Sequence, residues 1–212
     1  DRTGVFAVEV PYLLDMIEAN QFDTIYHEHL SYFSVGTLVH LFKRYDLRVI
    51  HVERFAVHGG SIVVFVGQAD GSWETQSSVE ELVRLEERTG LTSESYYRRF
   101  STRVEQTRGA LRDLLNQLRI AGKRVAGYGA PAKGNTLLNA CGVSSQELEY
   151  VSDTTELKQG FVLPGTHVPI RSPAYAKQYP PDYFLLLAWN YAKEIIEREM
   201  EYLQRGGYFI IP

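Results

Sequence analysis

The sequence predicts an α/β protein in two parts joined by helices, and three observations support this. Apolar runs of strand length lie near both ends, a long helical stripe occupies the middle, and strands alternate with helices from Lys123 onward. At 212 residues, 44% of them hydrophobic, the chain can bury a substantial core. We expect the end of a doubly wound sheet over residues 1–70, a helical connector over 71–122 and a smaller Rossmann-like domain over 123–212.

The first part begins with an apolar strand, Val5–Val10, of the kind that is buried on both faces of a parallel sheet. Such a strand needs neighbours on both sides, so we expect further strands of this domain upstream of the first residue. A helix over Ser34–Tyr45 has Ser34 as its predicted N-cap. Arg48–Arg54 and Ser61–Val66 then form an antiparallel hairpin. This order is typical of the end of a methyltransferase-type doubly wound domain.

The connector follows a polar, turn-rich boundary at residues 67–76. Its first helix runs from Ser78 to about Arg88, and Ser78 with Glu81 three positions later predicts a capping box. Its second helix is long, because apolar residues recur in steps of three and four from Tyr97 to Leu118. We interpret this helix as a strut between domains; a helix that binds a partner is the alternative.

The second part alternates strands with helices, which predicts a compact unit with a parallel sheet. RVAGYG, LEYVSD, THVPI, YFLLLAW and YFII are the predicted strands. Ala132–Cys141 and the segment NYAKEIIEREMEYLQRG are the predicted helices.

A glycine-rich turn, GYGAPAKGN, joins the first strand and helix of this part. Its backbone N–H groups and the following helix N-terminus suit an anion, and Lys133 adds a positive charge. The spacing matches neither the dinucleotide fingerprint nor the phosphate loop, and a turn that simply needs glycine is the structural alternative. The candidate substrate-binding residues of this turn are Gly127, Gly129, Lys133 and Asn135.

Two further residues are expected at the same edge of the sheet. Asp153 lies 24 positions beyond Gly129, where an acidic residue of a Rossmann unit accepts hydrogen bonds from ribose hydroxyls. Trp189 follows the buried strand YFLLLAW, and the loop PGTHVP is expected beside the same crevice. Asp153 could equally cap a loop, and Trp189 could belong to the core.

The stretch YHEHLSYFS holds the densest group of candidate catalytic residues. His29 is the candidate base, because imidazole titrates near neutrality. Tyr26 can donate a hydrogen bond to a developing oxyanion, and Glu28 can accept one from a hydroxyl. Half-buried packing is the alternative, and a zinc site at His27 and His29 lacks the H-E-x-x-H spacing and a nearby cysteine, so we expect no metal. His58, in the hairpin turn, is a secondary candidate for substrate binding.

Composition excludes several other functions. The net charge is −4, without a long basic run, so we expect neither a nucleic-acid nor a membrane partner. The single cysteine, Cys141, lies in an apolar helical pattern and cannot form an intrachain disulfide. With no signal peptide or membrane-length apolar run, we expect a cytoplasmic protein.

Four stretches, YHEHLSYFS, HGGS, GYGAPAKGN and SDTTELKQGFVLPGTHVPI, together carry a family resemblance. In order and spacing they resemble the C-terminal half of the S-adenosylmethionine-dependent sugar C-methyltransferases, which act at carbon 3 of nucleotide-linked 4-keto deoxysugars. The family's Tyr-x-Glu-His motif corresponds to Tyr26, Glu28 and His29. The zinc cysteines, the acidic and glycine-containing donor loop, and an upstream catalytic tyrosine and histidine have no counterpart here.

The resemblance implies methyl transfer through an enolate, with the nucleotide end of the substrate held by the C-terminal unit. We expect this chain by itself to be inactive and not to bind S-adenosylmethionine, and we expect the edge of the Val5–Val10 strand to promote self-association. A nicotinamide-dependent oxidoreductase and a non-catalytic nucleotide-binding module are the alternatives.

Overall fold

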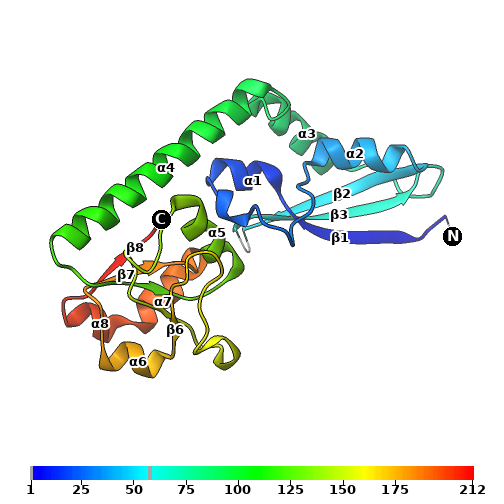
Figure 1. The fold of residues 1–212 in the computed structure, drawn as a ribbon. Coiled ribbons are helices and arrows are strands. Elements are labelled where there is room, and N and C mark those ends of the chain that lie inside the picture. The colour runs from blue at the N-terminus through cyan, green and yellow to red at the C-terminus, as the bar shows by residue number, and fades with distance from the viewer. Residues whose placement is uncertain (1, 57–58) are drawn as a thin grey trace. The chain divides into compact units, whose positions relative to one another are not determined.

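The structure, a computed structural model, describes residues 2–56 and 59–212 and divides into two compact units (Figure 1). The first unit comprises Asp1–Phe22 and His29–Arg103, and the second comprises Asp23–Glu28 and Val104–Pro212. Each unit combines a sheet with helices, which confirms the predicted α/β class. The three-part division at residues 70 and 122 stays a prediction. Among the described residues, none of the helices is both long and apolar enough to cross a bilayer.

The first unit contains a three-stranded antiparallel sheet in the order β1-β3-β2. Strands β2 (Leu47–Phe55) and β3 (Ser61–Gln68) form the predicted hairpin, in which Val52 lies opposite Val64. Val64 also lies opposite Val8 of β1 (Val5–Pro11), so β3 is the central strand. Strand β3 is largely buried because it has a neighbouring strand on each side.

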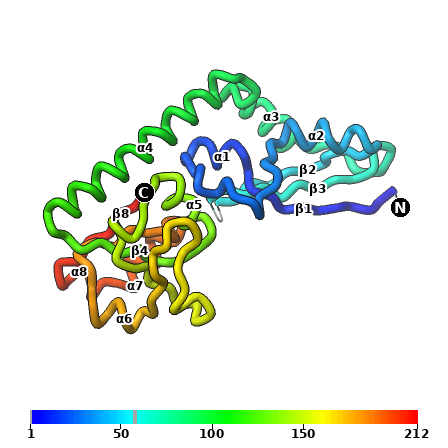
Figure 2. Tube along the Cα trace, viewed as in Figure 1, coloured from blue at the N-terminus to red at the C-terminus, as the bar shows by residue number. Residues whose placement is uncertain are grey.

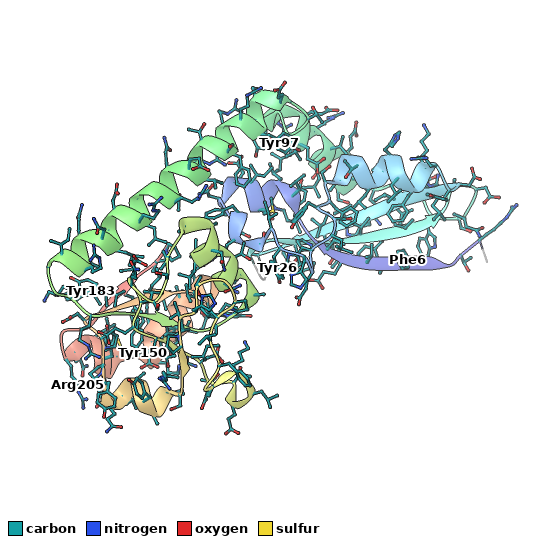
Figure 3. All side chains as sticks on the ribbon, viewed as in Figure 1. Phe6, Tyr26, Tyr97, Tyr150, Tyr183 and Arg205 are labelled. Atoms are coloured by element: carbon teal, nitrogen blue, oxygen red, sulfur yellow. The ribbon has the colours of Figure 1, made fainter. Side chains whose placement is uncertain are left out.

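Strand β1 differs from the prediction of a parallel strand buried on both faces, which was wrong. It pairs antiparallel with β3 alone and lies at an edge of the sheet described here. Its side chains are largely exposed. Phe6, labelled in Figure 3, has 57% of its surface exposed. A continuous apolar run gives no information on strand direction, because burial in either kind of sheet produces the same run.

Helices α1 (Leu13–Glu18), α2 (Val35–Lys43) and α3 (Ser77–Thr89) complete the sheet's core. Ser34 is the N-cap of α2, as predicted, and forms a capping box with Thr37. The capping box predicted at Ser78 was wrong. Helix α3 begins one residue earlier, and the Ser78 hydroxyl instead accepts a hydrogen bond from the backbone N–H of Val52 and lies 2.8 Å from His51 Nδ1.

Glu86, in α3, is a buried carboxylate with 4% of its surface exposed. Its oxygens accept hydrogen bonds from the backbone N–H groups of Val35 (2.6 Å) and Gly36 (2.9 Å), at the start of α2. Oε1 also accepts from the hydroxyl of Tyr12, which is completely buried. One carboxylate therefore satisfies helix N–H groups that have no partner within α2 and links three segments of the first unit.

We predict that Glu86→Ala destabilises the first unit by about 3 kcal/mol or more, because it leaves several buried donors unpaired. Equilibrium urea unfolding, followed by circular dichroism, measures the change. Glu80→Ala is the matched control: Glu80 lies on the same helix, is two-thirds exposed and forms an ion pair with Arg84. Equal stability of the two variants would contradict the role given to Glu86.

The second unit contains a five-stranded, entirely parallel sheet in the order β6-β5-β4-β7-β8. Figures 1 and 2 show this sheet together with the helices of the unit. Counted from β4, this order is 3-2-1-4-5, which is the Rossmann strand order without its sixth strand, and it confirms the prediction of a parallel sheet. The strands are β4 (Val125–Tyr128), β5 (Val151–Ser152), β6 (Ile170–Arg171), β7 (Tyr183–Leu186) and β8 (Tyr208–Ile210). The helices are α5 (Ala132–Cys141), α6 (Pro173–Gln178), α7 (Ala192–Arg198) and α8 (Met200–Gln204).

Two helical predictions have different outcomes. The long helix is confirmed as α4 (Glu94–Ile120), whose residues to Arg103 belong to the first unit and whose remainder belongs to the second. The single helix predicted over NYAKEIIEREMEYLQRG is instead α7 and α8, separated at Glu199. Glu199 leaves helical geometry while its carboxylate accepts a hydrogen bond from the Tyr128 hydroxyl, so tertiary contact overrides the sequence pattern.

The aromatic side chains of the second unit pack around its sheet, where Tyr150 is buried and donates its hydroxyl to the backbone oxygen of Tyr179 (Figure 3). Cys141, at the end of α5, is also buried, and burial raises the pKa of its thiol to about 11 against the opposing charges of Arg108 and Arg112. It therefore acts as a small core residue.

Candidate functional site

The glycine-rich turn lies at the carboxyl edge of the second unit's sheet, between β4 and α5. Gly129 has φ +82°, a left-handed conformation that favours glycine. Gly127 and Gly134 are needed for close packing: a Cβ on Gly127 would lie 2.7 Å from Val151, and one on Gly134 would lie 2.6 Å from Leu187. The three glycines thus bring β4, β5, α5 and the end of β7 together, which is how glycine acts in dinucleotide-binding turns.

The first turn of α5 carries the features of an anion site. Its N-cap, Pro131, supplies no side-chain hydrogen bond, so the first N–H groups of the helix have no partner within the helix. Asn135 lies in the same turn, and its Oδ1 is buried without a hydrogen-bond partner among the residues that the structure describes. The start of α5 therefore combines backbone N–H donors with one buried acceptor, the Oδ1 atom of Asn135.

We predict that Gly134→Ala lowers the stability of the second unit by about 1–3 kcal/mol, because its methyl group must displace Leu187 or the helix. Gly109→Ala is the control. Gly109 lies inside α4, where a Cβ would have nothing within 4 Å, so alanine there should stabilise the chain by about 0.5–1 kcal/mol through helix propensity. Thermal unfolding of both variants tests whether Gly134→Ala lowers the stability and Gly109→Ala raises it. A Gly134→Ala variant with wild-type stability would refute the packing role.

Asp153 follows β5, as predicted, and both its oxygens have backbone partners. Oδ2 accepts from the N–H of Ala130 at 2.6 Å, and Oδ1 accepts from the N–H of Thr155 at 2.7 Å. Burial alone would raise the pKa of Asp153, but these hydrogen bonds outweigh it and hold the pKa below its ordinary value. Asp153 therefore fixes the glycine-rich turn, while its predicted contact with ribose stays a prediction.

Lys133 and Trp189 meet beside the turn. The Lys133 ammonium donates a hydrogen bond to Asn190 Oδ1 at 2.5 Å and lies 4.6 Å from the centre of the Trp189 ring. The Trp189 indole donates to Asp23 Oδ2 at 2.6 Å. These four side chains, the Asp23 cluster, come from distant parts of the sequence but belong to the second unit.

Asp23 was missed by the sequence interpretation. Burial raises the pKa of its carboxyl group, and the Trp189 hydrogen bond and the charge of Lys133 oppose that rise. Burial also lowers the pKa of Lys133, and Asp23 opposes the change. The available signal was an acidic residue three positions before Tyr26, but nothing in the local pattern places it beside residues 133 and 189.

The predicted catalytic residues lie in an irregular segment that follows a short 3₁₀ helix, Phe22–Thr24. Tyr26 and His29 are half-buried, and Glu28 is exposed. Burial, then the charges of Glu28 and Asp23, raise the pKa of Tyr26, so its phenol stays protonated and able to donate. The His27 ring packs against that of Tyr26, with centroids 6.1 Å apart. Among the described residues, no three histidine, cysteine or acidic side chains gather as a metal site.

Two other predictions concern loops. His58 lies outside the described residues. The loop PGTHVP packs on α5 through Asn139, which donates to the backbone oxygen of Pro164 at 3.1 Å. Asn139 is in the last turns of α5, so this contact lies away from the helix N-terminus, and the structure gives no support to the expected position beside the turn.

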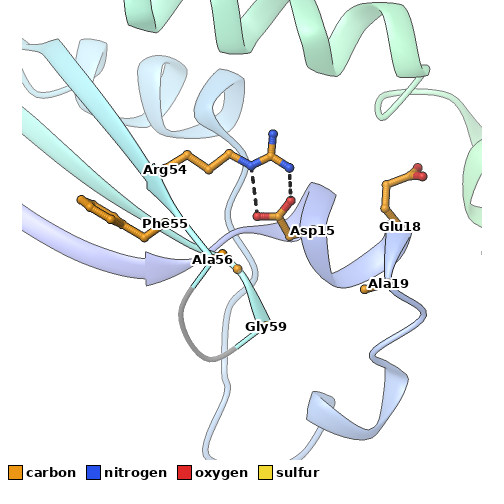
Figure 4. A pocket seen from close by; sticks show the side chains of 8 residues that line it. Asp15, Glu18, Ala19, Arg54, Phe55, Ala56 and Gly59 are labelled. Carbon is orange, nitrogen blue, oxygen red and sulfur yellow. Dashed lines mark hydrogen bonds and ion pairs between the residues drawn. The ribbon is translucent and has the colours of Figure 1, made fainter. Parts of the chain in front are cut away.

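A cavity of about 480 Å³ lies in the first unit, beside Gly59 and Gly60 (Figure 4). Its charged groups already have partners, since Arg54 forms a two-point ion pair with Asp15 and the Tyr96 hydroxyl donates to Glu18. The cavity therefore offers mainly apolar surface, with few polar groups left to orient a ligand.

The fold and turn define an α/β protein with a Rossmann-like second unit. A model of the family described as "C-methyltransferase C-terminal domain" matches residues 56–212. The chain is also 52% identical over 209 residues to C-methyltransferase NovU of Streptomyces niveus, a match that covers 99% of this chain and 50% of that protein. The chain belongs to this C-methyltransferase family, and it spans about half the length of the curated relative it matches.

Proposed function

We propose that this chain supplies the proton-transfer residues and the nucleotide-binding unit of a C-methyltransferase that acts at carbon 3 of a nucleotide-linked 4-keto deoxysugar. Its family membership and 52% identity to a C-methyltransferase support the reaction class. The observation that carries the residue roles is the location of Tyr26, Glu28 and His29 within four positions of one irregular segment, where side chains can approach a substrate.

In this proposal His29 removes the proton from carbon 3, which is acidic because it lies next to the 4-keto group. The electron pair moves onto the ketone oxygen, giving an enolate. The protonated phenol of Tyr26 donates a hydrogen bond to that oxygen, and the raised pKa keeps the phenol neutral at physiological pH. Glu28, which is exposed, accepts a hydrogen bond from a sugar hydroxyl.

The methyl donor that the proposal requires is S-adenosylmethionine. The described residues of the first unit do not fit a site for it, because β1 leads to α1 through Pro11 and the buried Tyr12 rather than through a glycine-rich turn. In the second unit, the corresponding turn between β4 and α5 is assigned to the nucleotide end of the substrate. We therefore assign no donor contact to this chain and expect no calorimetric binding of S-adenosylmethionine to it.

The nucleotide end of the substrate is assigned to the turn between β4 and α5. A diphosphate suits the first N–H groups of α5, which no side chain caps among the residues that the structure describes, and Lys133 lies in the same helical turn. Binding energy at this remote end orients the sugar without entering the chemical step.

We predict that His29→Ala lowers kcat for methyl transfer at least about 100-fold in the intact protein, because general-base catalysis is lost. Product formation followed by mass spectrometry measures it. His40→Ala, on the exposed surface of α2, is the control and should retain wild-type turnover. Turnover of His29→Ala within about tenfold of wild type would exclude His29 as the base.

We predict that Lys133→Ala weakens binding of thymidine diphosphate about tenfold, the loss expected when a single charged contact is removed. Isothermal calorimetry measures the dissociation constant. Lys123→Ala, an exposed lysine of the same unit, is the control for a general loss of positive charge. Unchanged affinity in Lys133→Ala, or no binding by the wild-type protein, would show that the nucleotide does not bind at the turn between β4 and α5.

A further inference from the structure

Asp23 is a buried carboxylate with no role in the reaction proposed above, although it lies three positions before Tyr26. Only 3% of its surface is exposed. We infer that Asp23 is a positioning residue, which fastens the segment Asp23–Glu28 to Trp189 and Lys133 and thereby orients Tyr26. The consequence for catalysis rests on the proposed function, whereas the ordering of the segment does not.

The first support is the direction of the Asp23–Trp189 hydrogen bond. An indole N–H is a donor with no alternative acceptor role, and it meets Asp23 Oδ2 at 2.6 Å across 166 positions of sequence. A hydrogen bond to a carboxylate is shorter and stronger than one between neutral groups. The contact therefore fixes the orientation of both side chains instead of merely filling space.

The second support is the way in which the surrounding groups hold the cluster together. The Trp189 ring carries the Lys133 ammonium on its face, and Asn190, the next residue, accepts a hydrogen bond from that ammonium. Lys133 also provides the positive charge that opposes the cost of burying Asp23. The acidic group is thus held from two elements, the first turn of α5 and the segment after β7.

The third support is a backbone path from Asp23 to Tyr26. The backbone N–H groups of Asp23 and Thr24 oppose the rise that burial causes in the pKa of the Asp23 carboxyl group. The backbone oxygen of Thr24 in turn accepts a hydrogen bond from the N–H of Tyr26 at 3.1 Å. The Asp23–Trp189 hydrogen bond and the Tyr26–Thr24 backbone hydrogen bond therefore lie within four consecutive residues, so fixing Asp23 restrains the residue assigned to the enolate oxygen.

The segment's order is tested by amide hydrogen exchange of the intact protein without ligand. In Asp23→Ala, the amides of residues 24–28 should exchange at least about tenfold faster, while those of 125–128 in β4 keep their wild-type rates. Asp23→Asn should restore slow exchange to within about threefold, because its amide oxygen can still accept the indole N–H. Glu201→Ala, which removes an exposed pair with Arg205, should change neither region.

Trp189→Phe provides a second route if Asp23→Ala does not fold. It keeps an aromatic ring but removes the indole donor, and it should accelerate exchange of 24–28 as Asp23→Ala does. Unchanged exchange in a folded Asp23→Ala or Trp189→Phe variant would overturn the inference. Fast exchange in Asp23→Asn equal to that of Asp23→Ala would also overturn the assigned role of the hydrogen bond.

The catalytic consequence is tested with steady-state kinetics on the same variants. Asp23→Ala should lower kcat at least about tenfold and leave KM within about threefold, because Tyr26 loses its orientation rather than its substrate contact. Wild-type kcat in a variant with accelerated exchange would overturn the positioning role. If the intact wild-type methyltransferase, including the part that binds the methyl donor, transferred no methyl group to a keto sugar, the proposed function would be refuted. The exchange result would still decide the inference on Asp23.

Discussion

Buried carboxylates that must find donors are the constraint on which both units depend. Glu86 is satisfied by the start of α2 and by Tyr12, so the first unit's helices are linked through one acidic side chain. Asp153 is satisfied by two backbone N–H groups around the glycine-rich turn. An ionised carboxylate without such partners would cost several kcal/mol, so each one specifies where its donors lie.

The sequence was sufficient where local chemistry decides the structure. Ser34 caps α2 because its hydroxyl reaches an N–H three residues away, and the glycines around Gly129 form the expected strand-to-helix turn. It was insufficient where distant groups compete for a side chain. Ser78 has the sequence pattern of a cap but bonds to strand β2, and β1 has the apolar run of a buried parallel strand but lies antiparallel at an edge.

The same contrast between local and long-range chemistry applies to the residues of the candidate site. Tyr26, Glu28 and His29 are recognisable because their residue types and spacing are local, and the β4–α5 turn is recognisable by its glycines. Asp23 could not be recognised, because its structural role depends on its hydrogen bond to Trp189, 166 positions later, and on Lys133 beside the Trp189 ring. Long-range pairing of a single acidic residue leaves no periodic or compositional signal in one sequence.

The contact between α2 and Glu86 also bears on biosynthesis. Val35 leaves the ribosome 51 residues ahead of the carboxylate that receives its N–H group. At typical synthesis rates of about 5–20 residues per second, Glu86 follows helix α2 after about 3–10 s. During that interval the hairpin of β2 and β3 can pair and Ser34 can cap α2, but the N–H groups of Val35 and Gly36 still lack the carboxylate that receives them. The hydrogen bonds between Glu86 and the start of α2 can therefore form only after α3 has emerged from the ribosome.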